Sequence, residues 1–418
     1  MRNDAVTSKI DWWIVLIYLV ITTTGLLTIY AAVYDAEHTD IYDLSTSYGK
    51  QFLWLVVSFG AGLFLLCVNA RFFNNVAYII YGAAILLLMA TLVVGSTIAG
   101  SKSWINLGFM SFQPSEFAKF ATALALAHYL DKIDRDFKKT GTQLTAYAIV
   151  FFPMMLVLLQ GDAGSALVFS VFLIVFYKEG MSGRILIIGL AAIAIFVVTL
   201  LVGKIMTIIG IIAVCGIILF LLKKKKEYIW KMLGIASIAI IFSLSVDFMF
   251  NNVLKQHQRT RINIILGLED DPLGVGYNLR QSKTAIGSGG VFGKGFLHGT
   301  MTKYDFVPEH HTDFIFCTIA EEQGFVGVIL LFIVYVALMV KLVMMANRQR
   351  STFSRIYGYS TASIFFFHFF VNIGMTIGLL PVIGIPLPFM SYGGSSLFFF
   401  TVMLFVFIKQ DANRKDIL

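Results

Sequence analysis

The longest polar stretch of the chain, residues 250–323, holds acidic and basic side chains in close succession. A carboxylate within hydrogen-bond reach of a hydroxyl can act as a general base, and cationic groups stabilise a departing phosphate. Such a mixture, together with flexible glycines, suits a substrate that carries a diphosphate and hydroxyl-rich groups. The residues concerned are the acids Asp271, Glu309 and Asp313 and the bases Arg259, Arg261, Lys283 and Lys294.

The same stretch also has a purely structural interpretation. The Asp271-Pro272 pair and the many glycines favour turns, as in a solvated surface loop. A loop of this length without a helical pattern is uncommon unless it is functional, which favours the chemical interpretation. Glu269 and Asp270 are neighbouring alternatives to Asp271 for the role of base.

A second polar group, from Gln113 to Lys119, opens the apolar segment 114–130. Proline is tolerated in a first helical turn, and Glu116 and Lys119 are three residues apart, so they share one helix face and can pair. Ionisable groups within a membrane helix are costly and usually face a cavity. This pair is therefore either a structural ion pair or part of a polar pocket that receives an anionic head group, with Lys119 as the counter-charge and Ser115 nearby.

Two further segments contain residues of types that can contribute to a binding site. Trp104 follows Lys102 in an outer loop, where a Trp is either an interfacial anchor or a surface for a sugar or a lipid chain. Residues 383–396 are rich in proline and glycine at membrane depth. A broken helix is tolerated there only where protein covers the backbone, which predicts a re-entrant cavity wall.

Nucleotide-binding and cysteine motifs are missing from the sequence. A phosphate-binding loop would need glycine at Ser288 and serine or threonine at Gly295, and a dinucleotide fingerprint would need glycine at Phe292. ATP-driven chemistry is therefore unsupported. The cysteines lie far apart and show no metal-ligand or disulfide spacing, so no resident metal site is expected; they are Cys67, Cys215 and Cys317.

The elements that position these groups are membrane helices. The chain is 58% hydrophobic and 13% charged, and its apolar runs have the length that crosses a bilayer. We predict an all-α polytopic membrane protein, a single integral domain over 1–418 with about 10–12 transmembrane helices, the first of them retained rather than cleaved. The expected spans are 12–33, 50–69, 74–95, 114–130, 144–160, 163–179, 183–203, 205–222, 229–249, 324–345, 356–380 and 392–409.

The charge of the loops orients these spans. Loops 130–142, 223–228 and 346–355 are basic and fall on the side of the N-terminus, which the positive-inside rule assigns to the cytoplasm. Segments 96–113, 160–164 and 250–323 then lie outside. The same rule accounts for the net charge of +8, so nucleic acid is not an expected partner.

At four places the sequence resembles the SEDS family (shape, elongation, division and sporulation), which RodA and FtsW typify. The motifs occur in the family's order along nearly the whole chain, and the glycine-rich stretch 287–300 is more similar to RodA than to FtsW. The matching motifs are Gln113-Pro114-Ser115-Glu116, Asp271-Pro272-Leu273-Gly274, Pro308-Glu309 with His311-Thr312-Asp313-Phe314, and Pro386-Leu387-Pro388 with Ser391-Tyr392-Gly393-Gly394-Ser395.

The resemblance implies a SEDS-like helical bundle that polymerises lipid II into glycan strands on the outer face of the bacterial cytoplasmic (inner) membrane. It also implies a class B penicillin-binding transpeptidase and other cell-wall elongation proteins as partners. By this carry-over Asp271, in the loop 250–323, is the catalytic residue. The substrate-binding candidates are Trp104, Lys102, Gln113, Ser115, Glu116, Lys119, Arg259, Arg261, Gln281, Glu309 and His311.

The sequence departs from the family pattern in two respects. The family often has arginine just before the tryptophan, where this chain has Ser103, with Lys102 one place earlier. A phosphate contact assigned to the family's arginine is therefore unsupported here. The family also typically has ten spans, and segment 205–249 looks like an inserted helix pair.

The expected reaction is a single displacement. Asp271 takes the proton of the acceptor sugar's 4-hydroxyl, which attacks C1 of the donor, and undecaprenyl pyrophosphate leaves to give a β-1,4 linkage. Lys119, Arg259, Arg261 or a divalent ion (Mg²⁺ or Mn²⁺) would stabilise the leaving group. The rival classes are a lipid II flippase or transporter, a division-type (FtsW-like) polymerase, and a scaffold for cell-wall enzymes.

Overall fold

The computed structural model separates into two compact units, Met1–Gly180 with Asn278–Leu418, and Met181–Tyr277. The residues that the structure describes are 10–34, 42–98, 100–106, 108, 111–132, 137, 139–221, 226–252, 256–268, 275–302, 306 and 310–415. Each unit is described by itself.

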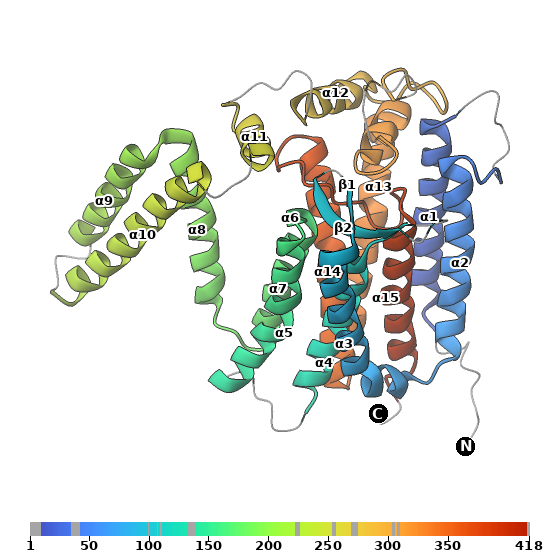
Figure 1. Ribbon diagram of the computed structural model, residues 1–418, viewed down its shortest axis with the longest axis horizontal. Helices are drawn as coiled ribbons and strands as arrows, with labels where there is room; N and C mark the ends of the chain where they lie inside the picture. The colour runs from blue at the N-terminus through green and yellow to red at the C-terminus, as the bar shows by residue number, and fades with distance from the viewer. Residues whose placement is uncertain are drawn as a thin grey trace. The chain divides into compact units, whose positions relative to one another are not determined.

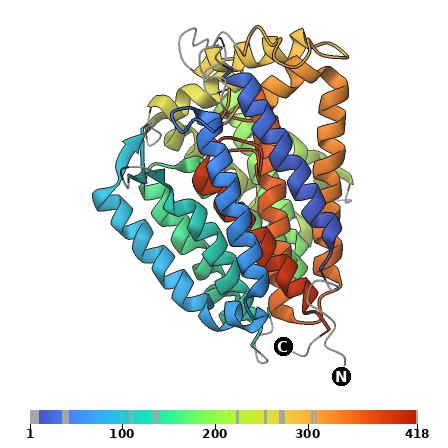
Figure 2. The same cartoon turned by 90° about the vertical axis from the view of Figure 1, so that its right-hand side faces the viewer.

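The first unit is a bundle of helices that stand side by side (Figures 1 and 2). Successive helices alternate in direction, and α12 lies at the end that is uppermost in Figure 1, which we call the upper end. The elements are α1 (Trp12–Ala32), α2 (Ser47–Cys67), α3 (Ala70–Val94), α4 (Pro114–Leu130), α5 (Thr140–Leu159), α6 (Ala163–Val168), α7 (Phe172–Lys178), α12 (Val275–Ser288), α13 (Ile315–Asn347), α14 (Thr352–Thr376) and α15 (Gly394–Ala412).

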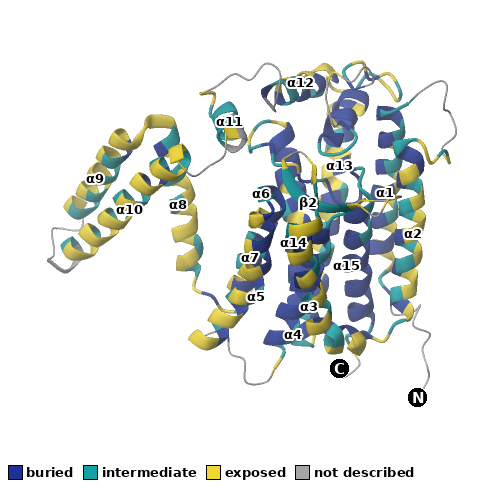
Figure 3. Ribbon diagram, in the orientation of Figure 1, coloured by how far each residue is buried: buried dark blue, intermediate teal, exposed yellow. Residues whose placement is uncertain are grey.

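Helix α15 is the most deeply buried of the nine described apolar helices, because 94% of the residues in its apolar 18-residue stretch lie inside the protein (Figure 3). It packs closely against α2 because Gly62 has no side chain, and a Cβ there would lie 2.8 Å from the ring of Phe405. Polar groups near its lower end are bonded to backbone. Lys409 Nζ donates to the carbonyl of Leu66 at 2.8 Å, and Gln410 Nε2 donates to that of Ala70 at 2.9 Å.

Ion pairs tie the lower ends of three helices together. Asp11, just before α1, accepts from Lys341 at 2.8 Å and from Arg348 at 3.3 Å, and Arg348 also binds Asp411 of α15. Burial alone would raise the pKa of the Asp11 carboxyl, but its bonds to Lys341 and Arg348 outweigh burial and bring that pKa below its ordinary value. The charged groups at this end are thus used for structure.

A small antiparallel sheet joins α3 to α4 at the upper end of the bundle (Figure 1). Its strands are β1 (Ser96–Ile98), β2 (Ser101–Asn106) and β3 (Ser111–Phe112), with Ser96 opposite Trp104 and Ile105 opposite Phe112. The sequence analysis did not predict these strands. They are very short, and a segment of two to six residues carries too little alternation to be recognised.

The second unit consists of α8 (Gly183–Val202), α9 (Lys204–Leu221), α10 (Lys226–Asn252) and α11 (Gln256–Ile265). Gly203 turns the chain sharply between α8 and α9 with a φ of +86°, which favours glycine. Thr199 and Ser243 share a hydrogen bond of 3.0 Å, and Lys204 pairs with Asp247 at 2.9 Å. Most other side chains of these helices are apolar and exposed, as expected of surfaces that face lipid.

The prediction of an all-α polytopic membrane protein is confirmed. Among the described residues, nine helices are long and apolar enough to span a membrane, namely α1, α2, α3, α5, α8, α9, α10, α13 and α15. Helices α4 and α14 and the α6–α7 pair run beside the spanning helices of the first unit (Figure 1). Helix α13 begins at Ile315, before the predicted span, and Gly324 marks a kink where that span was expected to start.

The expectation that 250–323 lacks helical structure is wrong for the part of it that the structure describes. It contains α11, α12 and the start of α13. The described buried residues of helix α12 are Gly276, Leu279, Ser282 and Ala285, at intervals of three, and Ser282 donates to the carbonyl of Thr376 at 2.7 Å. A short helix with so narrow a buried face looks like a polar loop in the sequence.

Candidate active site

The first turn of α4 meets two other helices at the upper end of the bundle. Gln113 Nε2 donates to Asp162 Oδ2 at 3.1 Å and to Ser165 Oγ at 3.4 Å, and the Gln113 N–H donates to Ser395 Oγ at 3.4 Å. Asp162 also caps α6 by accepting from the backbone N–H of Ser165 at 2.9 Å. Gln113 therefore joins the N-terminal ends of α4, α6 and α15.

Glu116 and Lys119 form the predicted pair, with Lys119 Nζ 2.7 Å from Glu116 Oε1. Both side chains are almost fully buried, with 3% and 1% exposed. Among the described residues, Glu116 Oε2 and the Ser115 hydroxyl have no hydrogen-bond partner. A buried polar atom without a partner is costly, so this buried cluster has unused capacity for a further hydrogen bond.

A third ionisable group, which the sequence analysis missed, completes the cluster. His368 of α14 lies with Nε2 2.9 Å from Lys119 Nζ and with Nδ1 3.1 Å from the carbonyl oxygen of Pro386. The Lys119 ammonium also lies 5.4 Å from the centroid of the Phe400 ring. A histidine in an otherwise apolar span is the signal that could have revealed this residue.

The segment between α14 and α15 is non-helical, as its prolines and glycines predicted, and its backbone is covered by side chains. Asn372 Nδ2 donates to the carbonyls of Asp313 at 2.8 Å and Ile385 at 2.7 Å. The Tyr335 hydroxyl donates to the carbonyl of Pro388 at 2.5 Å, and Gln51 Nε2 donates to that of Ser391 at 3.3 Å. These donors meet the requirement that irregular backbone at membrane depth be covered by protein.

The sheet holds the predicted tryptophan and lysine. Trp104 is half-buried in β2, and its carbonyl accepts from Ser96 Oγ at 3.1 Å. Lys102 Nζ donates to the carbonyl of Val93 at 2.8 Å, and its backbone N–H donates to that of Gln160 at 2.8 Å. Ser103, at the position of the family arginine, is buried. Lys102 is thus engaged with the end of α3, and Ser103 offers no charge.

The other predicted residues are more widely placed. The His311 carbonyl accepts from the Tyr392 N–H at 2.9 Å, so His311 contacts the non-helical segment, and Gln281 is half-buried on α12. Arg259 lies on α11 in the second unit, and nothing is described of the Arg261 side chain. Asp271 and Glu309 lie outside the described residues.

The glycine-rich turn after α12 is organised around a carboxylate that the sequence analysis did not single out. Glu321 is completely buried and accepts from Lys294 Nζ at 2.6 Å. It also accepts from the backbone N–H groups of Thr300 and Met301, each at 2.8 Å, and of Thr302 at 3.0 Å. Lys294 and these amides hold the turn on α13.

The described residues include no group of three or more His, Cys, Asp or Glu side chains that could hold a metal ion. The three cysteines are free thiols.

The structure brings together five polar residues near the start of α4, and the sheet that leads into α4 carries Trp104. The five residues are Gln113, Ser115, Glu116, Lys119 and His368. One ammonium can neutralise part of an anionic head group.

This polytopic bundle matches a known protein class. A family model described as "Cell cycle protein", which groups FtsW, RodA and SpoVE, matches residues 11–207 and 189–415. The chain belongs to this family.

Individual relatives are similar over almost the whole chain. The peptidoglycan glycosyltransferase MrdB of Escherichia coli K12 is 32% identical over 93% of this chain and 91% of its own length. The peptidoglycan glycosyltransferase RodA of Treponema pallidum is 32% identical over 98% of this chain and 99% of its own length. A chain in a solved peptidoglycan synthase complex is 27% identical, with a TM-score of 0.73 over 97% of this chain and 99% of that one.

The buried pair predicts a specific pattern of stability. In Lys119→Met, Glu116 would remain buried without its counter-charge, and loss of one partner of a buried pair costs about 3–5 kcal/mol. The double variant Glu116→Gln/Lys119→Met leaves no uncompensated charge, so it should be more stable than Lys119→Met alone. Thermal unfolding of the three proteins in detergent measures this order. Equal melting temperatures for the single variant and the wild type would contradict it.

Proposed function

We propose that this protein is a RodA-like peptidoglycan glycosyltransferase, which polymerises lipid II and releases undecaprenyl pyrophosphate. The observation that carries the proposal is 32% identity to MrdB and RodA, both named as peptidoglycan glycosyltransferases, over more than nine-tenths of the chain. The buried Glu116–Lys119 pair at the entrance of α4 supports it, because that pair is suited to an anionic head group. Because these relatives are named MrdB and RodA, and not FtsW, we assign the protein to cell elongation and shape and not to division.

In the proposed reaction Asp271 is the general base. It removes the proton of the 4-hydroxyl of the acceptor N-acetylglucosamine as the oxygen attacks C1 of the donor muramoyl unit. The bond from C1 to the diphosphate oxygen breaks at the same time, and inversion converts an α-linked donor into a β-1,4 product. A positioned carboxylate base contributes about 10²- to 10⁴-fold to such a step.

The negative charge that develops on the departing diphosphate needs a cation. Lys119 is the described candidate, since its ammonium is held in place by Glu116 on the same helix face. Arg259 and Arg261 are further candidates by their place in the sequence. We propose that any divalent ion accompanies the diphosphate and is not held in a protein cage.

Asp271→Asn should insert into the membrane normally but abolish polymerisation of lipid II, because an amide cannot accept the proton. The measurement is the length distribution of glycan chains made from labelled lipid II by purified protein in detergent. Glu269→Gln and Asp270→Asn are the matched controls and should retain activity. Parallel reactions with EDTA and with added Mg²⁺ test whether polymerisation requires a divalent ion. Glycan chains of wild-type yield from Asp271→Asn would refute the role of this carboxylate.

We also propose that the protein lies in the bacterial cytoplasmic membrane with its N-terminus in the cytoplasm. The upper end of the bundle, with the sheet and the Gln113 group, would then be extracytoplasmic. The basic loops 130–142 and 346–355 join helices at the lower end, in agreement with the positive-inside rule. The other basic segment, 223–228, includes the first residues of α10.

Reporter fusions test this orientation. Alkaline phosphatase, which is active only outside the cytoplasm, should be active when it is fused after residue 108 and inactive when it is fused after residue 139. A fluorescent protein that matures only in the cytoplasm should give the opposite result at the same two positions. Phosphatase activity after 139 and none after 108 would place the proposed site on the wrong side of the membrane.

A lipid II flippase is the rival function. It would need polar groups accessible from both sides of the membrane. In the bundle, the unpartnered Ser115 hydroxyl and Glu116 Oε2 lie near the upper end, whereas Asp11, Arg348 and Asp411 at the lower end satisfy one another in ion pairs. This one-sided distribution favours the polymerase. The glycan-chain assay described above distinguishes the two, and it also distinguishes a scaffold without activity.

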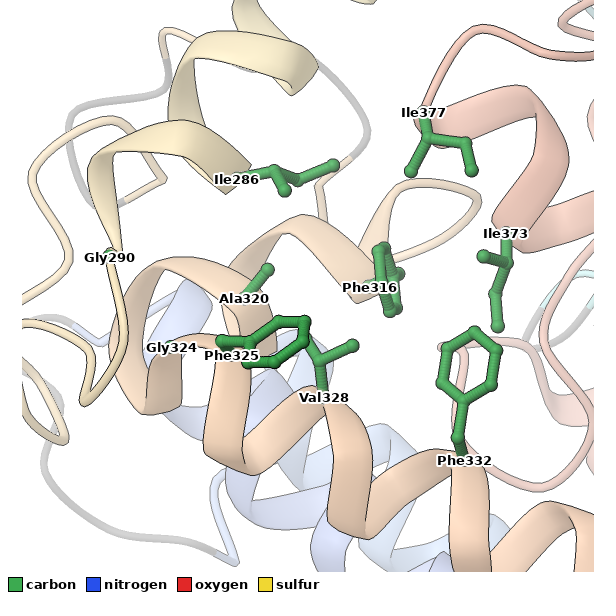
Figure 4. A pocket seen from close by; sticks show the side chains of 10 residues that line it. All are labelled: Ile286, Gly290, Phe316, Ala320, Gly324, Phe325, Val328, Phe332, Ile373 and Ile377. Atoms are coloured by element: carbon green, nitrogen blue, oxygen red, sulfur yellow. The ribbon is translucent and has the colours of Figure 1, made fainter.

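A membrane-anchored transpeptidase is the proposed partner, and other elongation proteins would join the same assembly. The bundle offers an apolar groove for a partner helix along α13. A cavity of about 260 Å³ is lined by side chains of α12, α13 and α14 (Figure 4), and Phe325, Val328 and Phe332 also line a second hollow of about 570 Å³ that continues to Val340. The solved complex supports the proposal, since its similar chain belongs to a peptidoglycan synthase assembly.

Val336→Trp tests this groove, because a bulky apolar side chain fills the hollow without placing charge in the membrane. We expect several-fold weaker co-purification of a co-expressed class B transpeptidase and unchanged melting temperature. Leu330→Trp is the matched control: Leu330 is also exposed on α13 but does not line the groove. Equal loss of the partner in both variants, or in neither, would contradict this location.

A further inference from the structure

His368 lies at the centre of the bundle and joins three elements. It belongs to α14 and is 1% exposed. Its Nε2 lies 2.9 Å from Lys119 Nζ of α4, and its Nδ1 lies 3.1 Å from the carbonyl oxygen of Pro386 in the non-helical segment. The ring also packs edge-on against Phe400, with centroids 4.8 Å apart. Every edge of the imidazole is thus in contact with protein.

The partners of the two nitrogens fix the form of the ring. A carbonyl oxygen can only accept a hydrogen bond, so Nδ1 must carry a proton to bond to Pro386. An ammonium can only donate, so Nε2 must present a lone pair to Lys119. A single neutral tautomer, with hydrogen on Nδ1, satisfies both contacts. A doubly protonated ring would place a positive charge 2.9 Å from the Lys119 ammonium.

The direction of the Lys119 ammonium follows from these contacts. An ammonium has three N–H donors. Glu116 Oε1 at 2.7 Å takes one and His368 Nε2 at 2.9 Å takes another. Two fixed bonds leave only one direction for the third N–H. Without the histidine, Lys119 would be held by Glu116 alone and its head could rotate about that single bond.

We infer that His368 is a positioning residue that aims Lys119 at the diphosphate of the substrate. This inference rests on the proposed glycosyltransferase function and adds a residue to its machinery. It also connects the Lys119 head to the backbone of the non-helical segment through the carbonyl of Pro386. His368 itself touches neither the sugar nor the phosphate, so its effect on the reaction is indirect.

A matched pair of variants separates positioning from packing. Gln and Met have similar size, but the amide oxygen of His368→Gln can accept from Lys119 whereas the side chain of His368→Met offers no comparable acceptor. We expect His368→Gln to retain activity within about threefold of wild type. We expect His368→Met to lose about ten- to a hundredfold in kcat/KM, the amount typical of one lost hydrogen bond to a charged group.

Controls guard against a defect in folding. Ser360→Ala removes a buried hydroxyl from the same helix and should behave as wild type. Among the described residues, that hydroxyl donates to the backbone carbonyl of Ile356, one turn earlier in α14. Melting temperature and gel filtration in detergent are recorded for every variant. A purely packing role predicts that the apolar His368→Met is at least as active as His368→Gln. That outcome would overturn the inference.

A measurement without substrate tests the tautomer directly. The chain has seven histidines, so nitrogen-15 NMR of histidine-labelled protein in nanodiscs should show one resonance pair that is missing in His368→Gln. We expect that pair to report hydrogen on Nδ1 and none on Nε2 at neutral pH. The opposite tautomer or a doubly protonated ring would refute the geometry. Absence of glycan synthesis by the wild type would instead refute the proposed function and leave the NMR result intact.

Discussion

The cost of a charged group inside a membrane is the constraint on which the site depends. Lys119 is 1% exposed, and an ammonium there persists only if other groups compensate for its lost hydration. Glu116 provides a counter-charge and His368 provides a lone pair, while Pro386 orients the histidine. The tight association of α4, α14 and the non-helical segment follows, because each contributes one link to this chain of contacts.

The same constraint governs the non-helical segment. A chain that leaves helical geometry at membrane depth exposes carbonyls that water cannot reach, so protein donors must meet them. Three helices supply those donors here: α2 through Gln51, α13 through Tyr335 and α14 through Asn372. The path of the segment is therefore fixed from three sides.

Hydropathy was sufficient to predict the helical class, and helical spacing was sufficient to predict the Glu116–Lys119 pair, because burial in lipid and helical spacing are local properties of a sequence. Of the twelve expected spans, those that became α4, α6–α7 and α14 are not among the nine described helices that are long and apolar enough to span a membrane. The contact of Lys119 with His368 could not be predicted, since these residues are 249 positions apart and meet only through packing. Helix α12 was also missed because its buried face is narrow, and the sheet was missed because its strands have only two to six residues. The role of Glu321 depends on a turn that closes around it, and no sequence pattern specifies that closure.

Two sides of helix α13 make different contacts. Phe332 and Val336 face the groove toward lipid, while Tyr335, between them in sequence, points inward and binds the carbonyl of Pro388. Any rotation of this helix about its axis would therefore shift the phenol together with the carbonyl it holds, two residues from the one that His368 binds. One side of α13 thus lines the apolar groove, while the adjacent side holds, through a single tyrosine hydroxyl, the same non-helical segment that orients His368.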